Sequence, residues 1–154
     1  RGIQKFIVHE INRARRQQED LTLILCDIDR FKQVNDNYGH DGGDIALKHV
    51  ADLFKETIRE QDGVARWGGE EFLFVLPTTN ENNGVVLAEK IRETLQSTPV
   101  PIKNTSLTIT ASFGVAQIHL ENGLNNALSL ADKALYRAKE NGRNKVLSAS
   151  SLAP

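Results

Sequence analysis

The chain has 154 residues, of which 40% are hydrophobic, and this is enough for one compact domain with a sizeable core. Its 19 basic and 20 acidic residues leave a net charge of -1, which excludes a broad basic field for a nucleic-acid polymer. The single cysteine, Cys26, excludes an internal disulfide framework and indicates a reducing compartment. No apolar run approaches the ~20 residues that span a bilayer, so we expect no membrane segment and no signal peptide.

The first part of the chain changes from a helical to an extended pattern and back. Residues 2–18 carry apolar side chains at helical spacing and predict an amphipathic helix. Residues 21–28 form a near-continuous apolar run, typical of a strand buried on both faces, in which Cys26 is a small apolar filler. Residues 31–37 predict a short helical turn, and the glycine-rich segment 38–44 predicts a loop that leads into another helix.

A hairpin is predicted next, because residues 64–67 and 72–76 are rich in β-branched, aromatic and apolar side chains. Gly68 and Gly69 lie between the two strands, and we expect positive φ there, since glycine enters that region without penalty. Further on, Gly114 predicts a bulge or a close approach of the backbone. The later elements are a polar connection at 80–83, a helix at 86–95 ending near Pro99, a strand at 107–118, a helix at 124–138 with Gly142 as its C′ residue, and an edge strand at 144–147.

The order of these elements predicts the fold class. Helices alternate with strands and a hairpin lies in the middle, so we expect an α/β (α+β) fold with a central mixed β-sheet flanked by helices and open on one face. We expect a single domain over residues 1–148. The small polar tail at 149–154 is expected to be frayed.

Two acidic segments are candidates for a metal site. The buried strand ends in Asp27-Ile28-Asp29, and Glu70 and Glu71 follow the two glycines of the hairpin. If the strand lies beside the hairpin, Asp27 and the two glutamates converge at one end of the sheet. Three carboxylates make an oxygen-only site that suits Mg²⁺ holding substrate phosphates. The alternative is an exposed turn with two solvated glutamates.

Several motifs occur together in one order and spacing, at residues 27–32, 35–36, 39–41, 43–44 and 68–72. The sequence therefore resembles the GGDEF domain of the diguanylate cyclase family from near the N-terminus to about Lys145. The resemblance implies a fold similar to the palm of nucleotidyl cyclases and polymerases. Family members usually carry an Asp-x-Leu-Thr-Gly-Leu-x-Asn-Arg segment upstream, and we expect this chain to begin inside or just after it.

The resemblance implies that two GTP molecules condense to cyclic di-GMP with release of two pyrophosphates, with Mg²⁺ or Mn²⁺ as cofactor. It implies that Asp27, Glu70, Glu71 and the Ile28 carbonyl bind the metal, and that Glu70, Glu71 and Lys32 are catalytic. Backbone N–H groups at a helix start suit phosphate, and Lys32 adds a point charge there. The residues implied for GTP binding are Phe31, Lys32, Asn35, His40, Asp44, Lys139 and Arg143.

The guanine base has two donors on its pairing edge that adenine does not offer in that pattern. The carboxylate of Asp44 can accept from both donors, and Asn35 fits beside it with one donor and one acceptor. A site of this kind would penalise ATP strongly. The alternative role of Asp44 is a helix N-cap. The alternative role of Lys139 and Arg143 is complementation of a helix dipole at its C-terminus.

An Arg-x-x-Asp motif, Arg59 to Asp62, precedes the hairpin. In the family this position marks a separate inhibitory site for the product, and the resemblance implies Lys90 as a third residue of that site. Arg can make a bidentate contact to guanine, whereas Lys lacks the planar fork, so product affinity is expected to be reduced. The alternative is a salt bridge at the end of a helix.

The resemblance also implies partners. Each domain offers one half-site, so we expect a homodimer for catalysis, brought together by an upstream sensory domain of a larger, cytoplasmic or membrane-bound protein. Two other functions stay open from the sequence. One is a catalytically silent GGDEF-like receptor for cyclic di-GMP, and the other is a class III-like cyclase that makes a cyclic mononucleotide.

Overall fold

The computed structural model describes residues 2–152 of the chain. Among these residues no helix is both long and apolar enough to span a bilayer. The helices are α1 (Gly2–Gln17), α2 (Phe31–Thr57), α3 (Glu81–Ser97) and α4 (Gly123–Glu140), with one 3₁₀ turn, η1 (Ala149–Ser151). The strands are β1 (Leu21–Ile28), β2 (Gly63–Gly68), β3 (Glu71–Pro77), β4 (Val100–Ile102), β5 (Thr105–Leu107), β6 (Ala111–Gln117) and β7 (Val146–Ser148).

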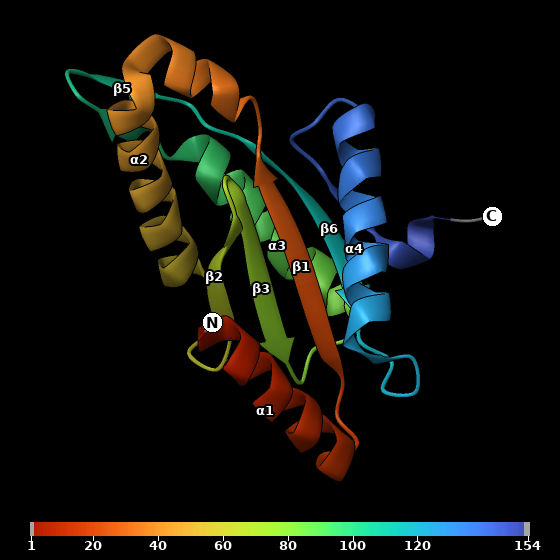
Figure 1. Cartoon of the computed structure of the whole chain (residues 1–154). Coiled ribbons are helices and arrows are strands. Elements are labelled where there is room, and N and C mark those ends of the chain that lie inside the picture. Colours follow the sequence, from red (N-terminus) through yellow and green to blue (C-terminus); the bar gives the residue numbers. More distant parts are fainter. Residues whose placement is uncertain (1, 153–154) are drawn as a thin grey trace.

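A five-stranded sheet in the order β2-β3-β1-β6-β7 forms the centre of the molecule, and β4 and β5 make a separate hairpin. Neighbouring strands of the large sheet are antiparallel except β6 and β7, which are parallel. Figure 1 shows α1 and α4 on the near side of this sheet and α3 behind it. The predicted mixed sheet flanked by helices is therefore confirmed.

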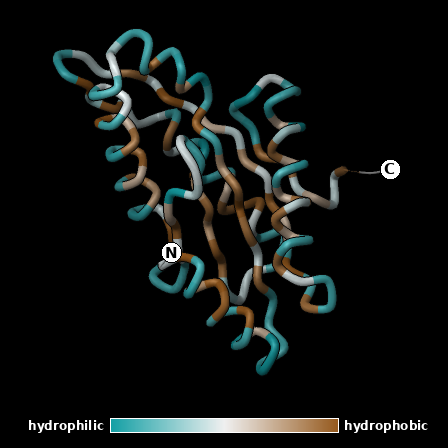
Figure 2. Tube along the Cα trace, viewed as in Figure 1, coloured by the Kyte–Doolittle hydropathy of each residue, from teal (hydrophilic) through white to brown (hydrophobic). Residues whose placement is uncertain are grey.

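Side chains of β1 alternate between two apolar cores. Leu21, Leu23 and Leu25 pack with α1 and α4, whereas Ile24 and Cys26 pack with α2 and α3. All eight residues of the strand are buried, and Figure 2 shows hydrophobic residues concentrated along the central strands. The expectation of a sheet open on one face was wrong, because helices cover both faces. The odd-numbered side chains of β1 thus point toward α4, which decides what surrounds Asp27.

Helix α2 is longer than the sequence predicts. Residues 31–57 form a helix with one kink at Gly39, whose φ of 75° and ψ of 174° are not helical. The expected loop at 38–44 is wrong, since helical backbone resumes directly after the kink. Gly42 and Gly43 serve close packing instead of a loop: a Cβ on Gly43 would lie 1.9 Å from Asn35 Oδ1.

Other boundaries also differ from the expectations. The predicted strand 107–118 is interrupted between β5 and β6, and β4 was not predicted. Helix α3 begins earlier, because Asn80 caps it by accepting a hydrogen bond from the backbone N–H of Asn83 at 2.8 Å. Two glycine predictions are confirmed: Gly142 has φ of 116°, and a Cβ on Gly114 would lie 2.1 Å from a backbone oxygen of α4.

The C-terminal segment was expected to be frayed. Its described part contains the turn η1, where the backbone N–H of Ser150 donates to Glu81 Oε2 at 3.2 Å. Residues 153 and 154 lie outside the described residues.

Candidate active site

The turn between β2 and β3 has little side-chain cover. Gly68 pairs with Glu71, so Gly69 and Glu70 form the tip. The expected positive φ at this turn was wrong, because the described glycines with positive φ are Gly39, Gly123 and Gly142. A Cβ on Gly69 would meet no atom within 4 Å. Gly69 therefore leaves open space over the backbone at the tip of the turn, into which a ligand can come close, whereas a Cβ on Gly68 would lie 3.5 Å from Glu71 Oε1.

Asp27 lies directly opposite Glu71 in the antiparallel pairing of β1 and β3. The backbone N–H of Ile28 donates to the carbonyl oxygen of Glu70 at 3.2 Å, which fixes the turn against the strand end. Facing side chains of an antiparallel pair have Cβ atoms about 4.5–5.5 Å apart, so the two carboxylates are neighbours. Lys139 from α4 forms an ion pair with Asp27 on the same face of the sheet.

Burial and neighbouring charges together change the pKa of the Glu71 carboxyl. Burial raises the pKa of its carboxyl above the ordinary 4.5, and the negative charge of Asp27 raises it further. Lys139 opposes this rise, while Asp132 and Glu70 add to it. The site thus carries more negative charge than its own lysine neutralises, which favours binding of a cation.

The donor set suits a hard cation, although the protein does not form a complete cage. Within residues 2–152 no group of three or more His, Cys, Asp or Glu side chains is placed to hold a metal ion. Mg²⁺ is usually held by one or two carboxylates together with substrate phosphates. The neighbouring carboxylates of Asp27 and Glu71 fit that mode, because the remaining ligands would come from the substrate.

The start of α2 adjoins this strand end. Arg30 precedes the helix with φ of 55° and provides no side-chain cap. Phe31 is buried at 9% exposure and anchors the first turn, whereas Lys32 is exposed. Uncapped N–H groups at a helix N-terminus with an exposed lysine beside them form a suitable site for phosphate.

The candidate base-binding residues lie on both sides of the Gly39 kink. Asn35 is half-buried and packs against Gly43, while His40 and Asp44 are exposed. Asp44 lies inside α2, so its alternative role as an N-cap was wrong. The kink thus brings the segment that carries Asn35 next to the segment that carries Asp44.

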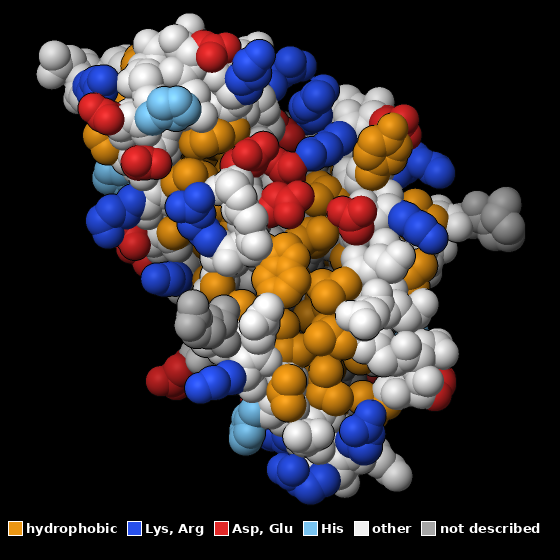
Figure 3. Space-filling view, viewed as in Figure 1, with side chains coloured by type: hydrophobic (Ala, Val, Ile, Leu, Met, Phe, Trp, Pro, Cys, Tyr) orange, Lys and Arg blue, Asp and Glu red, His pale blue; other side chains and the backbone are white. Residues whose placement is uncertain are grey.

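A cleft of about 500 Å³ opens between Glu71 of the hairpin and α4. Figure 3 shows acidic side chains gathered on this face beside Lys and Arg side chains, next to an apolar area. Sequence reasoning missed Asp132, although it lies seven residues before Lys139 and hence on the same side of the helix. The cleft is lined by Glu71, Asp132, Lys133, Leu135, Tyr136, Arg137, Lys139, Glu140 and Leu152.

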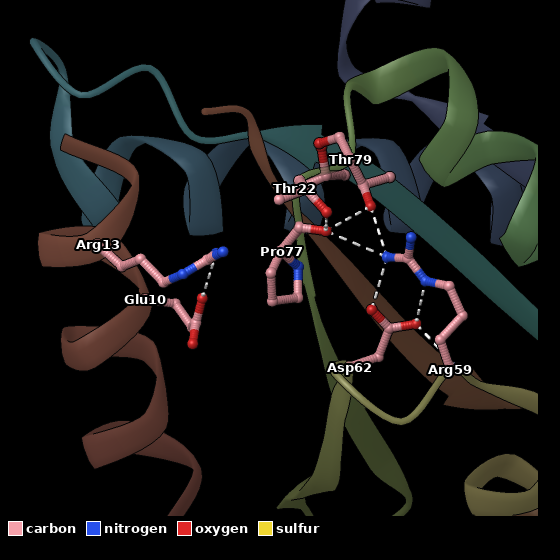
Figure 4. A network of polar contacts seen from close by, with 8 residues as sticks. Glu10, Arg13, Thr22, Arg59, Asp62, Pro77 and Thr79 are labelled. Atoms are coloured by element: carbon pink, nitrogen blue, oxygen red, sulfur yellow. Dashed lines mark hydrogen bonds and ion pairs between the residues drawn. The ribbon is translucent and has the colours of Figure 1, made fainter. Parts of the chain in front are cut away.

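Arg59 and Asp62 form an ion pair at the opposite end of the sheet (Figure 4). Arg59 Nε donates to Asp62 Oδ2 at 2.9 Å, and Nη2 donates to Asp62 Oδ1 at 2.7 Å. Nη2 also donates to Pro77 O at 3.1 Å and Thr79 Oγ1 at 2.6 Å. The hydrogen bonds with Asp62 raise the pKa of Arg59. The salt bridge expected as an alternative is present, with Lys90 exposed on α3.

The fold and the strand-end carboxylates agree with one family. The family model described as the GGDEF domain of diguanylate cyclase matches residues 1–145. The chain belongs to the GGDEF family. Diguanylate cyclase A of Treponema denticola is 39% identical over 142 residues, which make up 90% of this chain and 38% of that protein. This GGDEF chain therefore spans well under half of the length of that relative.

Solved GGDEF structures have the same fold. The active GGEEF domain of a diguanylate cyclase from Vibrio cholerae matches with a TM-score of 0.83 and 37% identity, covering 92% of this chain and 90% of that one. The GGDEF domain of DgcB from Caulobacter crescentus, in complex with c-di-GMP, matches with a TM-score of 0.86 and 30% identity, covering 92% and 85%.

Proposed function

We propose that this GGDEF domain, residues 1–148, is a diguanylate cyclase that condenses two GTP molecules into cyclic di-GMP and two pyrophosphates. The observation that carries the proposal is the pairing of Asp27 with Glu71 at a strand end, with Lys139 beside them and open space over Gly69 in the adjoining turn. Relatives named as diguanylate cyclases support it.

The substrate is held along its length by groups from three segments. The backbone N–H groups at Phe31 and the side chain of Lys32 hold phosphate at the start of α2, and Lys139 and Arg143 reach the terminal phosphates from the end of α4. The Asp44 carboxylate accepts from the two donors of guanine. Asn35 and His40 lie beside the base.

Asp27, Glu70, Glu71 and the Ile28 carbonyl would hold Mg²⁺ or Mn²⁺. When bound, the metal supplies positive charge that draws phosphate oxygens together and stabilises the leaving pyrophosphate. Glu71 lies opposite Asp27 at the proposed site, and its carboxylate is the candidate acceptor of the proton of the attacking hydroxyl.

Two copies of the domain are required for the reaction. The 3′-oxygen of each GTP attacks the α-phosphorus of the other, one P–O bond forms, and the bond to pyrophosphate breaks; the hydroxyl proton leaves with each attack. Because each domain binds one GTP, a homodimer brings the two half-sites together. Another region of a longer protein, which responds to a signal, would control this encounter.

A regulatory function is proposed for Arg59, Asp62 and Lys90, which would bind the product. Arg59 donates to Pro77 at the last residue of β3, whereas Glu71 is its first residue. Six residue steps of ~3.3 Å separate the two sites by about 20 Å, so the product bound at Arg59 would not compete directly for the GTP site.

The test is to incubate the protein with GTP and Mg²⁺ and to identify the product by mass spectrometry. We expect cyclic di-GMP from the parent protein and none from Glu70→Ala or Asp27→Asn. Glu56→Ala, at an exposed position near the end of α2, controls for the loss of a carboxylate. A Glu70→Ala variant that turns over at the parent rate would contradict the assignment. A parent that binds cyclic di-GMP but makes none would instead be a receptor.

A further inference from the structure

Asp29 is a buried carboxylate that the proposed chemistry does not use. It directly follows β1 and is 9% exposed. It accepts hydrogen bonds from Thr110 Oγ1 at 2.8 Å, Ser112 Oγ at 2.7 Å and the backbone N–H of Asn144 at 2.9 Å. None of the ion pairs within residues 2–152 includes it. Burial of a charge with neutral donors alone is costly, which indicates that this carboxylate holds part of the structure in place.

The backbone that Asp29 holds is an unfavourable turn after α4. Arg143 and Asn144 have φ of 66° and 48°, in the left-handed region that residues other than glycine rarely adopt. The N–H of Arg143 donates to Ala138 O at 3.0 Å. Asn144 is fixed from two sides, since its N–H donates to Asp29 and its Oδ1 accepts from Arg92 Nη1 at 3.1 Å. Asp29 therefore stabilises the backbone conformation of the turn that sets the direction of the Arg143 side chain.

Asp29 also lies next to the other candidate phosphate-binding segment. Its own N–H donates to the carbonyl oxygen of Thr110 at 2.9 Å, and Arg30 then leads into α2 with φ of 55°. One residue thus connects the start of α2, which carries Lys32, with the turn after α4, which carries Arg143. Asp29 and Asn144, which join these two segments, are 115 positions apart in the sequence.

We propose that Asp29 is a positioning residue for the triphosphate of the substrate. It fixes Arg143 relative to the start of α2, so that both segments reach the same chain of phosphates. The inference rests on the proposed function, since it takes the triphosphate of GTP as the ligand between the two segments. Asp29 acts through Arg143 and does not touch the substrate.

The test uses Asp29→Asn, which keeps the shape of the side chain but removes its charge and one acceptor. The affinity for inorganic triphosphate with Mg²⁺ is measured by calorimetry, beside steady-state kinetics with GTP. We expect the triphosphate affinity to fall roughly tenfold and KM for GTP to rise similarly, with a smaller change in kcat. Arg143→Ala should cause a similar loss, and the double variant should lose little more, because both changes act through one side chain.

Thr22→Val is the matched control. It removes a fully buried hydroxyl that donates to Thr79 O at the other end of β1, and it should leave the triphosphate affinity unchanged. If Asp29→Asn does not fold, Ser112→Ala removes one donor to the carboxylate and should give a smaller loss in the same direction.

The outcomes separate this inference from the proposed function. An unchanged triphosphate affinity in the folded Asp29 or Ser112 variant overturns the inference, as do losses that add fully to that of Arg143→Ala. A parent with no affinity for triphosphate overturns it too. A parent that binds triphosphate but makes no cyclic di-GMP rejects the proposed function alone, and the loss of affinity in Asp29→Asn then still supports the positioning role.

Discussion

Lys139 forms an ion pair with Asp27 although the two residues are 112 positions apart in the sequence. The Asp27 side chain is 7% exposed and that of Lys139 is 33% exposed. Lys139 therefore places its charge where a metal ion would bind Asp27. A divalent cation bound there, as proposed, would compete with the lysine, and the released ammonium group would become available to phosphate oxygens.

This competition predicts that Lys139→Met raises the affinity for Mn²⁺ in the absence of nucleotide. Methionine keeps most of the aliphatic length but removes the charge, so the gain should be several-fold, as expected for a partly exposed ion pair worth about 1 kcal/mol. Turnover of GTP should fall in the same variant. Calorimetry with Mn²⁺ measures the affinity, and Lys133→Met on the same helix is the control. Equal Mn²⁺ affinity in Lys139→Met and the parent would refute the competition.

The raised pKa of Glu71 predicts a pH-dependent gain in stability for Glu71→Gln. Because the folded state keeps this carboxyl protonated above its ordinary pKa of 4.5, the parent loses stability as pH rises from 4.5 through the raised pKa. Without metal, the variant should thus have a higher Tm than the parent at pH 7, and the difference should vanish below pH 4.5. Thermal unfolding across this pH range is the measurement.

Glu56→Gln, at an exposed site, reports the general effect of losing one negative charge. The expectation for Glu71 fails if its variant shows the same Tm difference at every pH. Saturating Mg²⁺ should reverse the sign at pH 7, since the metal then stabilises the parent through the carboxylate that the variant lacks.

The sequence was informative where local chemistry decides the structure. The apolar run that ends in Asp27 predicts a buried strand, and the pair Gly68-Gly69 between two apolar segments predicts the hairpin, so the convergence of Asp27 with Glu71 could be inferred. The extent of α2 could not be inferred from the sequence. Glycine usually interrupts helices, but Gly42 is required here by the close approach of Tyr38, and Gly43 by that of Asn35 from across the kink.

Contacts between distant segments were not predictable from spacing. Lys139 was expected only at the phosphates, because nothing in the local sequence indicates that the end of α4 crosses the end of β1. The same holds for Asp29, whose donors come from β6, the segment before it, and the turn after α4. A single sequence contains the residues of such contacts but gives no signal that pairs them.

The kink in α2 predicts that Gly39→Ala weakens the preference for GTP over ATP. Its φ of 75° and ψ of 174° suit only glycine, so alanine should cost about 1–3 kcal/mol or move Asn35 away from Asp44. Gly123→Ala is the matched control, because Gly123 has φ of 82° at the start of α4, away from the base site. Both variants should lose stability, and only Gly39→Ala should lower the ratio of kcat/KM for GTP to that for ATP.

Asp44→Ala should lose most of the same preference without the loss of stability, since Asp44 is exposed. The parent protein should prefer GTP by well over tenfold, as expected of a site built around the pairing edge of guanine. Equal turnover of ATP and GTP by the parent would contradict the proposed base site.

The ion pair of Arg59 with Asp62 decides which substitution of Arg59 can test product inhibition. Asp62 has a fully buried side chain, so Arg59→Ala leaves a buried carboxylate without its cation and should destabilise the fold by about 1–3 kcal/mol. A loss of inhibition in Arg59→Ala would then follow either from the destabilised fold or from the lost contact with the product. Arg59→Lys keeps the charge beside Asp62 but loses the planar fork that can bind guanine bidentately.

We therefore predict that Arg59→Lys weakens binding of cyclic di-GMP at least tenfold while the uninhibited rate stays at the parent level. Thr79→Val removes one acceptor of Arg59 and should lower Tm with little effect on product binding.

Lys90→Arg should tighten inhibition by supplying a second planar guanidinium that can bind guanine. In the parent, inhibition should be non-competitive with GTP, because the two sites lie at opposite ends of β3. Calorimetry with cyclic di-GMP is decisive: if the parent and Arg59→Lys bind it equally, or if GTP fully overcomes the inhibition, Arg59 and Asp62 form only a structural ion pair.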